Sequence, residues 1–396
     1  MTDTAGKPLG PGPGASATGA GLLRRHRRRW AKATALGAAV LVTAAAGTGW
    51  ALYAKLNANI TADDAAAREL ARYERERPTE LVRGAQNILL IGSDTRAGEG
   101  NSAYGPDLGS ERSDTTILLH LAANRRSATA VSLPRDLMVD IPGCRQPDGS
   151  RSEPVLAMFN HAFQLGGSAC TIRTVEKLTG IRIDHHVVVD FRGFKKMVNA
   201  VDGVQVCLKE PVDDKAAMLK LPAGKVMLDG EQALGFVRAR KSLGDGSDTE
   251  RMERQQRFLG ALVDKVQSND VLLNPVKLYP VLNAATSSLT TDPELASLRG
   301  LYQLVRGLRD IPTERVQFLT VPRESYVYDA NRDQLVEPEA EKLFARLRAD
   351  QPVAVAREIP QEAAETNGEA DGKGSPGDPS PTPTFRGNTA AEHTCE

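Results

Sequence analysis

Short apolar runs alternate with amphipathic segments from residue 86 onward. Several runs are apolar at both odd and even positions, as expected for strands of a sheet that is covered on both faces. They comprise Asn87–Ile91, Thr115–Leu121, Thr129–Leu133 and His186–Val189. Helical spacing of apolar residues lies between some of them. It covers Ala157–Leu165, Thr171–Leu178 and Phe191–Ala200. This alternation predicts one layered α/β domain over residues 86–358.

The longest apolar run lies near the N-terminus. Residues 33–54 contain no charged side chain, and a helix of 22 residues spans about 33 Å, which is enough to cross a bilayer. The basic stretch Arg24–Lys32 directly precedes it, and such residues stay in the cytoplasm. We therefore expect a single-pass type II protein of the cell membrane with an extracytoplasmic domain. A signal peptide cleaved near Ala44-Ala45-Ala46 is the alternative.

Composition sets three segments apart from the domain. Residues 1–32 are expected to form a disordered basic cytoplasmic tail, and residues 359–396 a disordered tail rich in acids and proline. Residues 55–85 are rich in Ala and in charged side chains. They are expected to form a helical stalk that holds the domain off the membrane.

Charge and cysteine content limit the function classes. The 50 Lys and Arg residues balance 50 Asp and Glu residues, so no nucleic-acid partner is expected, and an anion site has to be a local cluster of arginines. An extracytoplasmic domain favours disulfides. We expect Cys144 to pair with Cys170 and pin a loop, while Cys207 stays open as an alternative partner. The absence of Cys-x-x-Cys and His-x-x-x-His spacings argues against zinc.

Two acids lie beside predicted strands. Asp94 follows an apolar strand that ends in Gly and Ser, and Asp114 immediately precedes another strand. Ligands of open α/β sheets gather outside the carboxyl ends of strands. Carboxylates with neighbouring hydroxyls suit Mg²⁺. An ordinary turn or N-cap residue is the alternative for each acid.

Arginines supply the candidate anion site. Arg135 follows a strand that a proline ends. If the segment before residue 240 is extended, Phe236, Arg238 and Arg240 share a face, with the two arginine stems about 6.5 to 7 Å apart. Guanidinium groups match phosphate oxygens in a bidentate way. A salt-bridged surface ladder is the alternative.

A helix is predicted to begin with a capping box formed by Ser247 and Glu250. Arg251, Gln255 and Phe258 share one face of this helix. We therefore expect Arg251 to point at the fold or its cleft, with snorkelling at the helix end as the alternative.

Three histidines are candidate general bases. No partner for them is visible in the sequence, so structural roles are expected for His161, His185 and His186.

Several motifs follow one another in a consistent order over about residues 86–355. These are Leu89-Leu-Ile-Gly-Ser-Asp94, Arg112-Ser-Asp-Thr115, Ser132-Leu-Pro-Arg-Asp136, Asn160-His-Ala-Phe163, Leu178-Thr-Gly-Ile181, Leu228-Asp-Gly-Glu-Gln-Ala-Leu234, Val237-Arg-Ala-Arg240 and Arg254-Gln-Gln256. Together they resemble the LytR-CpsA-Psr family, and the cysteines and long C-terminal part resemble its actinobacterial branch.

The resemblance implies a layered α/β/α domain with a central mixed sheet behind one transmembrane helix. It also implies an extracytoplasmic, Mg²⁺-dependent phosphotransferase. Such enzymes move an anionic glycopolymer, such as a teichoic acid or a capsular or secondary wall polysaccharide, from an undecaprenyl-pyrophosphate carrier to peptidoglycan. The linkage is a phosphodiester at the muramic acid 6-hydroxyl. The family places the prenyl chain in an apolar tunnel inside the domain.

The resemblance also implies roles for single residues. Asp94 and Asp114 would hold Mg²⁺. The resemblance does not identify the acceptor of the hydroxyl proton, for which an acid near the metal, Asp94 or Asp114, is a candidate on chemical grounds. The pyrophosphate would be clamped by Arg112, Arg135, Arg238 and Arg240. The same site would be lined by Asp248, Arg251 and Gln255. Met158-Phe159 departs from the Lys-Ile that the family often has before Asn160.

Two other functions remain open on the sequence. A prenyl-pyrophosphate hydrolase would use the same arginines and metal with water as the acceptor. A non-catalytic regulator or polyanion-binding module is less consistent with the sequence, because no helix-turn-helix signal is visible and the cytoplasmic part is short.

Overall fold

The chain folds into two compact units, Met1–Lys55 and Leu56–Glu396. The computed structural model describes residues 19–93, 113–215, 217–239, 248–267, 275–357 and 383–393. The first unit holds most of helix α1 (Gly19–Ala58), and Thr34–Ala58 is long and apolar enough to cross a membrane. Residues 19–32 are helical rather than disordered, because Leu, Ala and Arg favour helix and extend the apolar one.

A nine-stranded mixed sheet forms the centre of the second unit, in the order β1-β12-β7-β2-β3-β4-β13-β17-β16. The expected central mixed sheet is thus confirmed. The four predicted strands are present as β2 (Gln86–Ser93), β3 (Ser113–Leu121), β4 (Ala128–Leu133) and β7 (His185–Asp190). The remaining strands are β1 (Thr61–Ala62), β12 (Leu289–Thr291), β13 (Val316–Thr320), β16 (Ala354–Ala356) and β17 (Thr384–Thr389).

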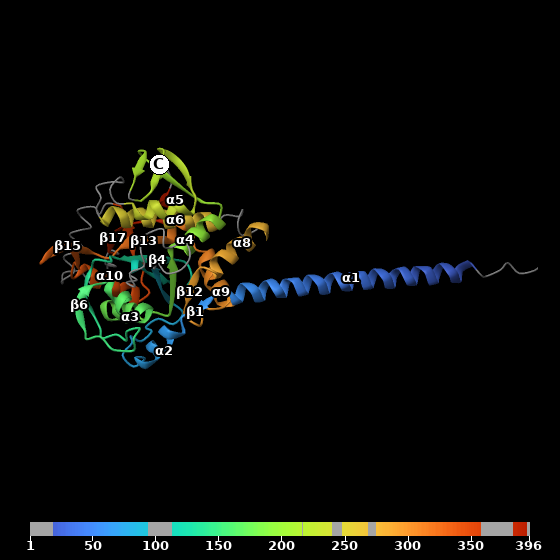
Figure 1. The fold of residues 1–396 in the computed structure, drawn as a ribbon, viewed down its shortest axis with the longest axis horizontal. Coiled ribbons are helices and arrows are strands. Elements are labelled where there is room, and N and C mark those ends of the chain that lie inside the picture. Colours follow the sequence, from blue (N-terminus) through green and yellow to red (C-terminus); the bar gives the residue numbers. More distant parts are fainter. Residues whose placement is uncertain are drawn as a thin grey trace, which may run out of the picture. The chain divides into compact units, whose positions relative to one another are not determined.

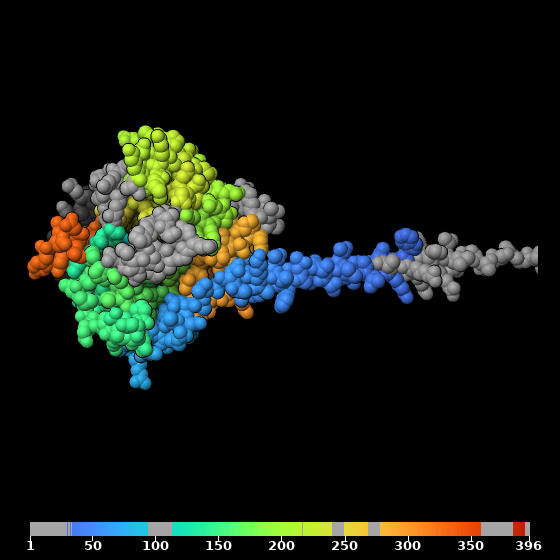
Figure 2. Space-filling view, in the orientation of Figure 1, coloured from blue at the N-terminus to red at the C-terminus, as the bar shows by residue number. Residues whose placement is uncertain are grey.

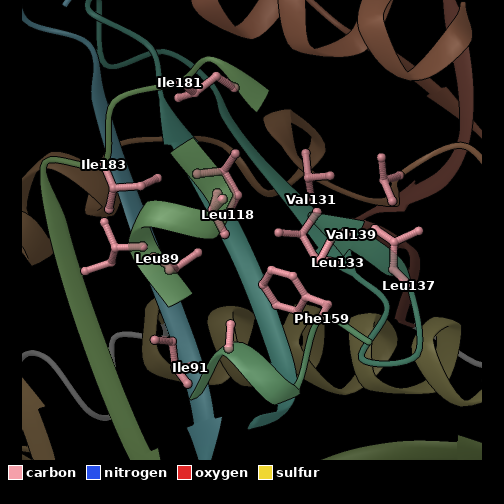
Figure 3. Packing of buried hydrophobic residues seen from close by; sticks show 14 of the residues in the cluster. Leu89, Ile91, Leu118, Val131, Leu133, Leu137, Val139, Phe159, Ile181 and Ile183 are labelled. Carbon is pink, nitrogen blue, oxygen red and sulfur yellow. The ribbon is translucent and has the colours of Figure 1, made fainter. Parts of the chain in front are cut away.

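One face of the sheet is covered by α2 (Asp64–Arg72), α3 (His161–Thr179) and α10 (Glu339–Arg348), together with the hairpin of β5 (Met138–Ile141) and β6 (Val155–Met158). Figure 3 shows the fully buried Leu89, Leu118 and Val131 of three neighbouring strands facing Phe159. Alternate positions of each strand reach this core, because successive side chains point to opposite faces.

The opposite face packs against α6 (Asp248–Gln267) and α9 (Leu298–Arg309). Figure 1 shows α6 on one side of the sheet and α3 with α10 on the other. A further apolar cluster beyond α6 contains residues of α4, α5 and α8 and of two hairpins. Their bounds are α4 (Phe191–Ala200), β8 (Val204–Leu208), β9 (Val212–Asp214), β10 (Leu219–Leu221), β11 (Gly224–Leu228), α5 (Gly230–Arg238) and α8 (Pro275–Thr286). The layered α/β/α architecture is therefore confirmed.

Two of the three predicted helices are confirmed, and the third is wrong in its first part. Phe191–Ala200 is helix α4 as predicted, and Thr171–Leu178 lies inside α3. The helix predicted over Ala157–Leu165 is wrong in its first part, because residues up to Met158 pair with β5 as strand β6. That pairing is a tertiary contact which the local spacing does not encode.

The segment expected to be a stalk belongs to the folded unit. Strand β1 pairs with β12, and Ala66 and Leu70 of α2 are buried in the core. The guanidinium of Arg77 binds the nearly buried Glu176 carboxylate, with Nη2 and Oε1 2.8 Å apart. The expectation of a separate stalk over residues 55–85 is therefore wrong from residue 56 onward, because the amphipathic α2 buries its apolar face against α3.

The C-terminal segment is also part of the fold. Strand β17 lies between β13 and β16, and Phe385 is 5% exposed. It leads into the 3-10 turn η3 (Ala390–His393), in which Ala390 is fully buried. The expectation of a disordered tail is thus wrong for residues 384–393. An apolar side chain flanked by β-forming threonines adds a strand even beside an acidic, proline-rich stretch.

The disulfide is the one that was expected. Cys144 and Cys170 are bonded, with their Cα atoms 5.6 Å apart. A Cβ atom at Gly166 would lie 2.9 Å from the Cβ of Cys170, so this position needs glycine. Cys207 is also disulfide-bonded, but not to Cys144.

Candidate functional site

The site is built at one edge of the central sheet. Strands β2, β4, β7 and β13 run in the same direction, because β7 is parallel to β2, β13 is parallel to β4, and β3 is antiparallel to both β2 and β4. Their carboxyl ends therefore meet at the edge where β3 begins. This geometry places Arg135, which follows β4, beside Asp114 at the start of β3.

Arg135 and Asp114 are brought together as an ion pair. Nη1 of Arg135 lies 2.9 Å from Oδ1 of Asp114, and Nε lies 3.3 Å from Oδ2 of Asp136. The side chains of Arg135 and Asp114 are 22% and 35% exposed, so a ligand at the edge can reach both. A carboxylate has about four acceptor positions, so Asp114 retains capacity beyond this bond.

Arg238 reaches the same edge from a helix rather than from a strand. Its guanidinium carbon lies 4.7 Å from the centre of the Phe191 ring, which directly follows β7. The extended geometry expected for Phe236 and Arg238 is wrong, because Gly230–Arg238 is helix α5.

A capping motif at the start of this helix is visible in the sequence and predicts it. Asp229 Oδ1 accepts from the Gln232 amide at 2.9 Å, and the Gln232 side chain accepts from the Asp229 amide at 3.1 Å. The two residues form a reciprocal capping box. The Asp-x-x-Gln spacing is visible in the sequence.

Helix α6 carries the buried polar side chains of the site. Arg251 is 7% exposed, which confirms that it points inward. The Gln255 amide donates to the carbonyl of Val237 at 3.1 Å, and Gln256 donates to Ser132 Oγ of β4, also at 3.1 Å. Helix α6 is therefore fixed both to α5 and to the central sheet. Asp248 begins the helix.

Arg254 is a second buried arginine of α6, in the sequence motif Arg254-Gln-Gln256. It is 6% exposed and donates to the carbonyls of Phe236 and Ala239, at the end of α5. Burial, together with the nearby positive charges of Arg257 and Arg251, lowers the pKa of Arg254 to about 10. Arg254 remains charged at neutral pH. Like charges held this close favour a bound anion.

A cavity of about 660 Å³ adjoins the site at the end of β13. The hairpin of β14 (Arg323–Tyr326) and β15 (Asp329–Leu335) lines it together with α6 and β17. Arg323 donates to Thr249 Oγ1 at 2.6 Å and pairs with Asp333. The Asp333 amide donates to the carbonyl of Asp136, so the cavity wall continues directly from Arg135 and its partners.

The residues around Asp114 offer a metal ion few protein ligands. Among the residues that the structure describes, no group of three or more His, Cys, Asp or Glu residues could hold an ion. Two buried hydroxyls of β3, Ser113 Oγ and Thr116 Oγ1, have no hydrogen-bond partner among the described residues. Asp114 and Thr116 share a strand face. One carboxylate with a nearby hydroxyl fits Mg²⁺, which takes few protein ligands and keeps water and substrate oxygens.

Several predicted site residues fall outside the described part of the chain. These are Asp94, Arg112 and Arg240. Ser93, which precedes Asp94, ends β2 at the edge discussed above.

Two of the three histidines bind carboxylates within the fold, which is consistent with the expected structural roles. His185 Nδ1 lies 3.2 Å from Asp292, and His186 Nε2 lies 3.2 Å from Asp63. Burial alone would lower the pKa of His185, but its hydrogen bond and charge interaction with Asp292 outweigh burial and raise it. His161 begins α3.

Comparison with known proteins gives a consistent result. The profile of the LytR_cpsA_psr family matches residues 54–349. The chain is 35% identical over 290 residues to the "Probable cell wall biosynthesis protein LcpB" of Corynebacterium glutamicum, which covers 71% of this chain and 65% of that protein. The chain thus spans slightly less than two thirds of this relative's length.

A second relative is covered almost completely. The Bacillus subtilis "Polyisoprenyl-teichoic acid--peptidoglycan teichoic acid transferase TagT" is 29% identical over 329 residues, which is 80% of this chain and 95% of TagT. The fold is similar to that of a solved LytR-Csp2A-Psr enzyme from Actinomyces oris, with a TM-score of 0.54 and 21% identity. That likeness covers 68% of this chain and 93% of the solved one.

Proposed function

Because the chain belongs to the LytR-CpsA-Psr family, we propose that it transfers an anionic glycopolymer from an undecaprenyl-pyrophosphate carrier to peptidoglycan. The polymer is of the teichoic acid, capsular or secondary wall polysaccharide class. The product is a phosphodiester at the muramic acid 6-hydroxyl. The observation that carries the proposal is the ion pair of Arg135 with Asp114 at the edge of the central sheet, in a chain of which 80% aligns with a teichoic acid transferase.

The reaction needs charge neutralisation more than covalent help. Phosphoryl transfer passes through a loose transition state whose charge spreads over the phosphate oxygens, so fixed positive groups can supply most of the catalysis. Arg135 is fixed by two carboxylates and Arg238 by the Phe191 ring. Arg254 is fixed by two backbone carbonyls. Such groups need little reorganisation when the pyrophosphate binds.

The acceptor hydroxyl oxygen bonds to the phosphorus that carries the polymer. The bond from that phosphorus to the oxygen bridging the two phosphates breaks, and undecaprenyl phosphate leaves. The hydroxyl proton passes to a carboxylate, for which Asp94 and Asp114 are both proposed.

We propose that Asp114, with Asp94, holds Mg²⁺. The ion would act as a Lewis acid on the phosphate oxygens. Asp114 orients Arg135 through the ion pair between them. The cavity beside Asp333 and Arg323 provides a polar space next to this pair, in which sugar hydroxyls of a substrate can bind.

The proposed location is the outer surface of the cell membrane. The span Thr34–Ala58 follows the basic stretch Arg24–Lys32, which supports a type II orientation. The disulfide between Cys144 and Cys170 is consistent with an oxidising compartment.

The test uses the full chain in membranes with a polymer linked to undecaprenyl pyrophosphate and polymerised peptidoglycan. Mass spectrometry of muramidase digests should find polymer on muramic acid through a phosphodiester, with undecaprenyl phosphate released in equal amount. Release at the same rate without peptidoglycan would indicate the hydrolase instead. Neither product with Mg²⁺ present would reject the proposal.

A further inference from the structure

Helix α9 presents an unusual face to solvent. Its inward residues Leu301, Leu304 and Leu308 pack against the core of the sheet. Its outward face combines apolar and basic side chains: Tyr302 is 63% exposed and Val305 is 47% exposed. Arg299, Arg306 and Arg309 are exposed on the same helix, which contains no acidic residue.

The spacing of these residues makes one stripe. Positions 299, 302, 306 and 309 follow one another at intervals of three and four, so they lie along one side of the helix. Large exposed apolar side chains rimmed by basic ones are typical of helices that lie in a membrane interface. The nearest acid in the chain is Asp310, at the C-terminal end of the helix.

The position of α9 in the chain's fold supplies an independent argument. Its first amide, that of Leu298, donates to Oδ1 of Asn57 at 3.0 Å. Asn57 belongs to the last turn of the apolar segment Thr34–Ala58. The adjacent residues Leu56 and Asn59 are also held, since Leu56 is 5% exposed and Asn59 donates to Asn283. Where that segment leaves a bilayer, the first turn of α9 is therefore at the bilayer surface.

We propose that the Arg299, Tyr302, Val305, Arg306 and Arg309 face of α9 docks on the membrane and binds anionic lipid headgroups. Tyrosine suits the interface because its ring is apolar and its hydroxyl is polar. The arginines match the phosphates of the headgroups. Docking fixes the domain at two points, the span and α9, and so sets the distance between the bilayer and the catalytic edge. This inference rests on the membrane anchor of the proposed function but not on transfer activity.

In Figure 1, α9 lies on the opposite side of the folded unit from the β14–β15 hairpin. The orange segment that contains α9 is exposed in Figure 2. Tyr328, at the turn of that hairpin, is 85% exposed and provides a matched control tyrosine.

The experiment reconstitutes the full chain in nanodiscs containing phosphatidylglycerol and a lipid with a spin label near its headgroup. Trp30 and Trp50 are replaced by Phe, and tryptophan is introduced as Tyr302→Trp or Tyr328→Trp. We expect at least twofold quenching of fluorescence for Tyr302→Trp and none for Tyr328→Trp. Adding Arg299→Gln, Arg306→Gln and Arg309→Gln should remove the quenching.

A second measurement uses the natural chain, so it does not depend on the folding of any variant. Hydrogen exchange of peptides from α9 should be slower in phosphatidylglycerol nanodiscs than in phosphatidylcholine nanodiscs, while peptides from the β14–β15 hairpin should not change. Equal quenching at the two tryptophans overturns the proposal. Quenching that persists after the three arginines are replaced also overturns the proposal. Hydrogen exchange in α9 that is equal in the two kinds of nanodisc overturns it as well. None of these outcomes bears on whether the enzyme transfers polymer.

Discussion

Arg135 Nη1 lies 2.9 Å from Asp114 Oδ1, although Asp114 lies at the start of β3 and Arg135 follows the end of β4, 21 positions later in the chain. The pair joins the two kinds of group that phosphate chemistry needs, a planar cation and a hard oxygen ligand. Because Asp136 binds the same guanidinium at 3.3 Å, Arg135 stays oriented when Asp114 takes another ligand.

Replacing Arg135 tests its role in binding phosphate. Arg135→Ala is expected to lower polymer transfer by at least about 100-fold, as for loss of one oxyanion-stabilising donor, and Arg135→Lys should recover little because lysine lacks the planar fork. The measurement is the transfer assay above, with thermal unfolding as a check on the fold. Arg72→Ala is the control, since Arg72 pairs only locally with Glu69 at the surface. Transfer that survives in Arg135→Ala removes this arginine from the mechanism.

Asp114→Asn tests the metal. If the carboxylate holds Mg²⁺, this variant should need a Mg²⁺ concentration at least about tenfold higher for half-maximal transfer, because the amide is a weaker ligand for a hard cation. Chelation with EDTA should stop transfer by the natural chain, and Mg²⁺ should restore it. Asp213→Asn, in an exposed pair with Lys220, serves as the control. An unchanged Mg²⁺ response in Asp114→Asn would place the metal elsewhere.

The pair of His185 with Asp292 predicts a pH dependence of stability. Because the folded protein raises the pKa of His185, its contribution is complete below the usual histidine pKa of about 6.5 and is lost as pH rises through the raised value. The gap in unfolding free energy between the natural chain and His185→Gln should therefore shrink from pH 6 to higher pH, as measured by urea unfolding.

The pKa of His120 is shifted in the opposite direction to that of His185. The natural chain therefore has to be compared with His185→Gln at each pH. Burial lowers the pKa of His120, and the bond to Asp350 only partly counters burial. Its effect on stability thus grows with rising pH and would mask that of His185 in the natural chain alone. A gap for His185→Gln that widens with pH would contradict the assignment.

The C-terminal strand predicts a large cost for removing one side chain. Phe385→Ala should reduce the free energy of unfolding by about 3 to 5 kcal/mol, because it empties a buried site between α10 and the sheet. Val327→Ala, at a position that is 72% exposed, should cost little. Denaturant unfolding measures both. Similar values for the two variants would mean that β17 does not dock in solution.

The disulfide predicts a further loss. Cys144→Ala combined with Cys170→Ala opens a loop with a sequence separation of 26 and should reduce stability by about 3 kcal/mol. Thermal unfolding of the double variant checks this. The double variant is preferable to a reducing agent, which would also act on the disulfide of Cys207.

Local sequence determined those elements whose side-chain pattern is decisive over a few residues. Strands β2, β3, β4 and β7 each contain a short apolar run, and such runs favour strands that are buried on both faces. The inward position of Arg251 followed from its place on an apolar helix stripe. The family followed from the order of its motifs.

Tertiary structure alone decided which distant residues meet. The pairing of Arg135 with Asp114 depends on the antiparallel register of β3 and β4. Strand β17 joins the sheet by pairing with β13 and β16. Likewise, Asn57 meets the first turn of α9 across a separation of 241 positions. Spacing along the chain carries no information on such contacts, since they are chosen by burial and hydrogen bonding in the complete fold.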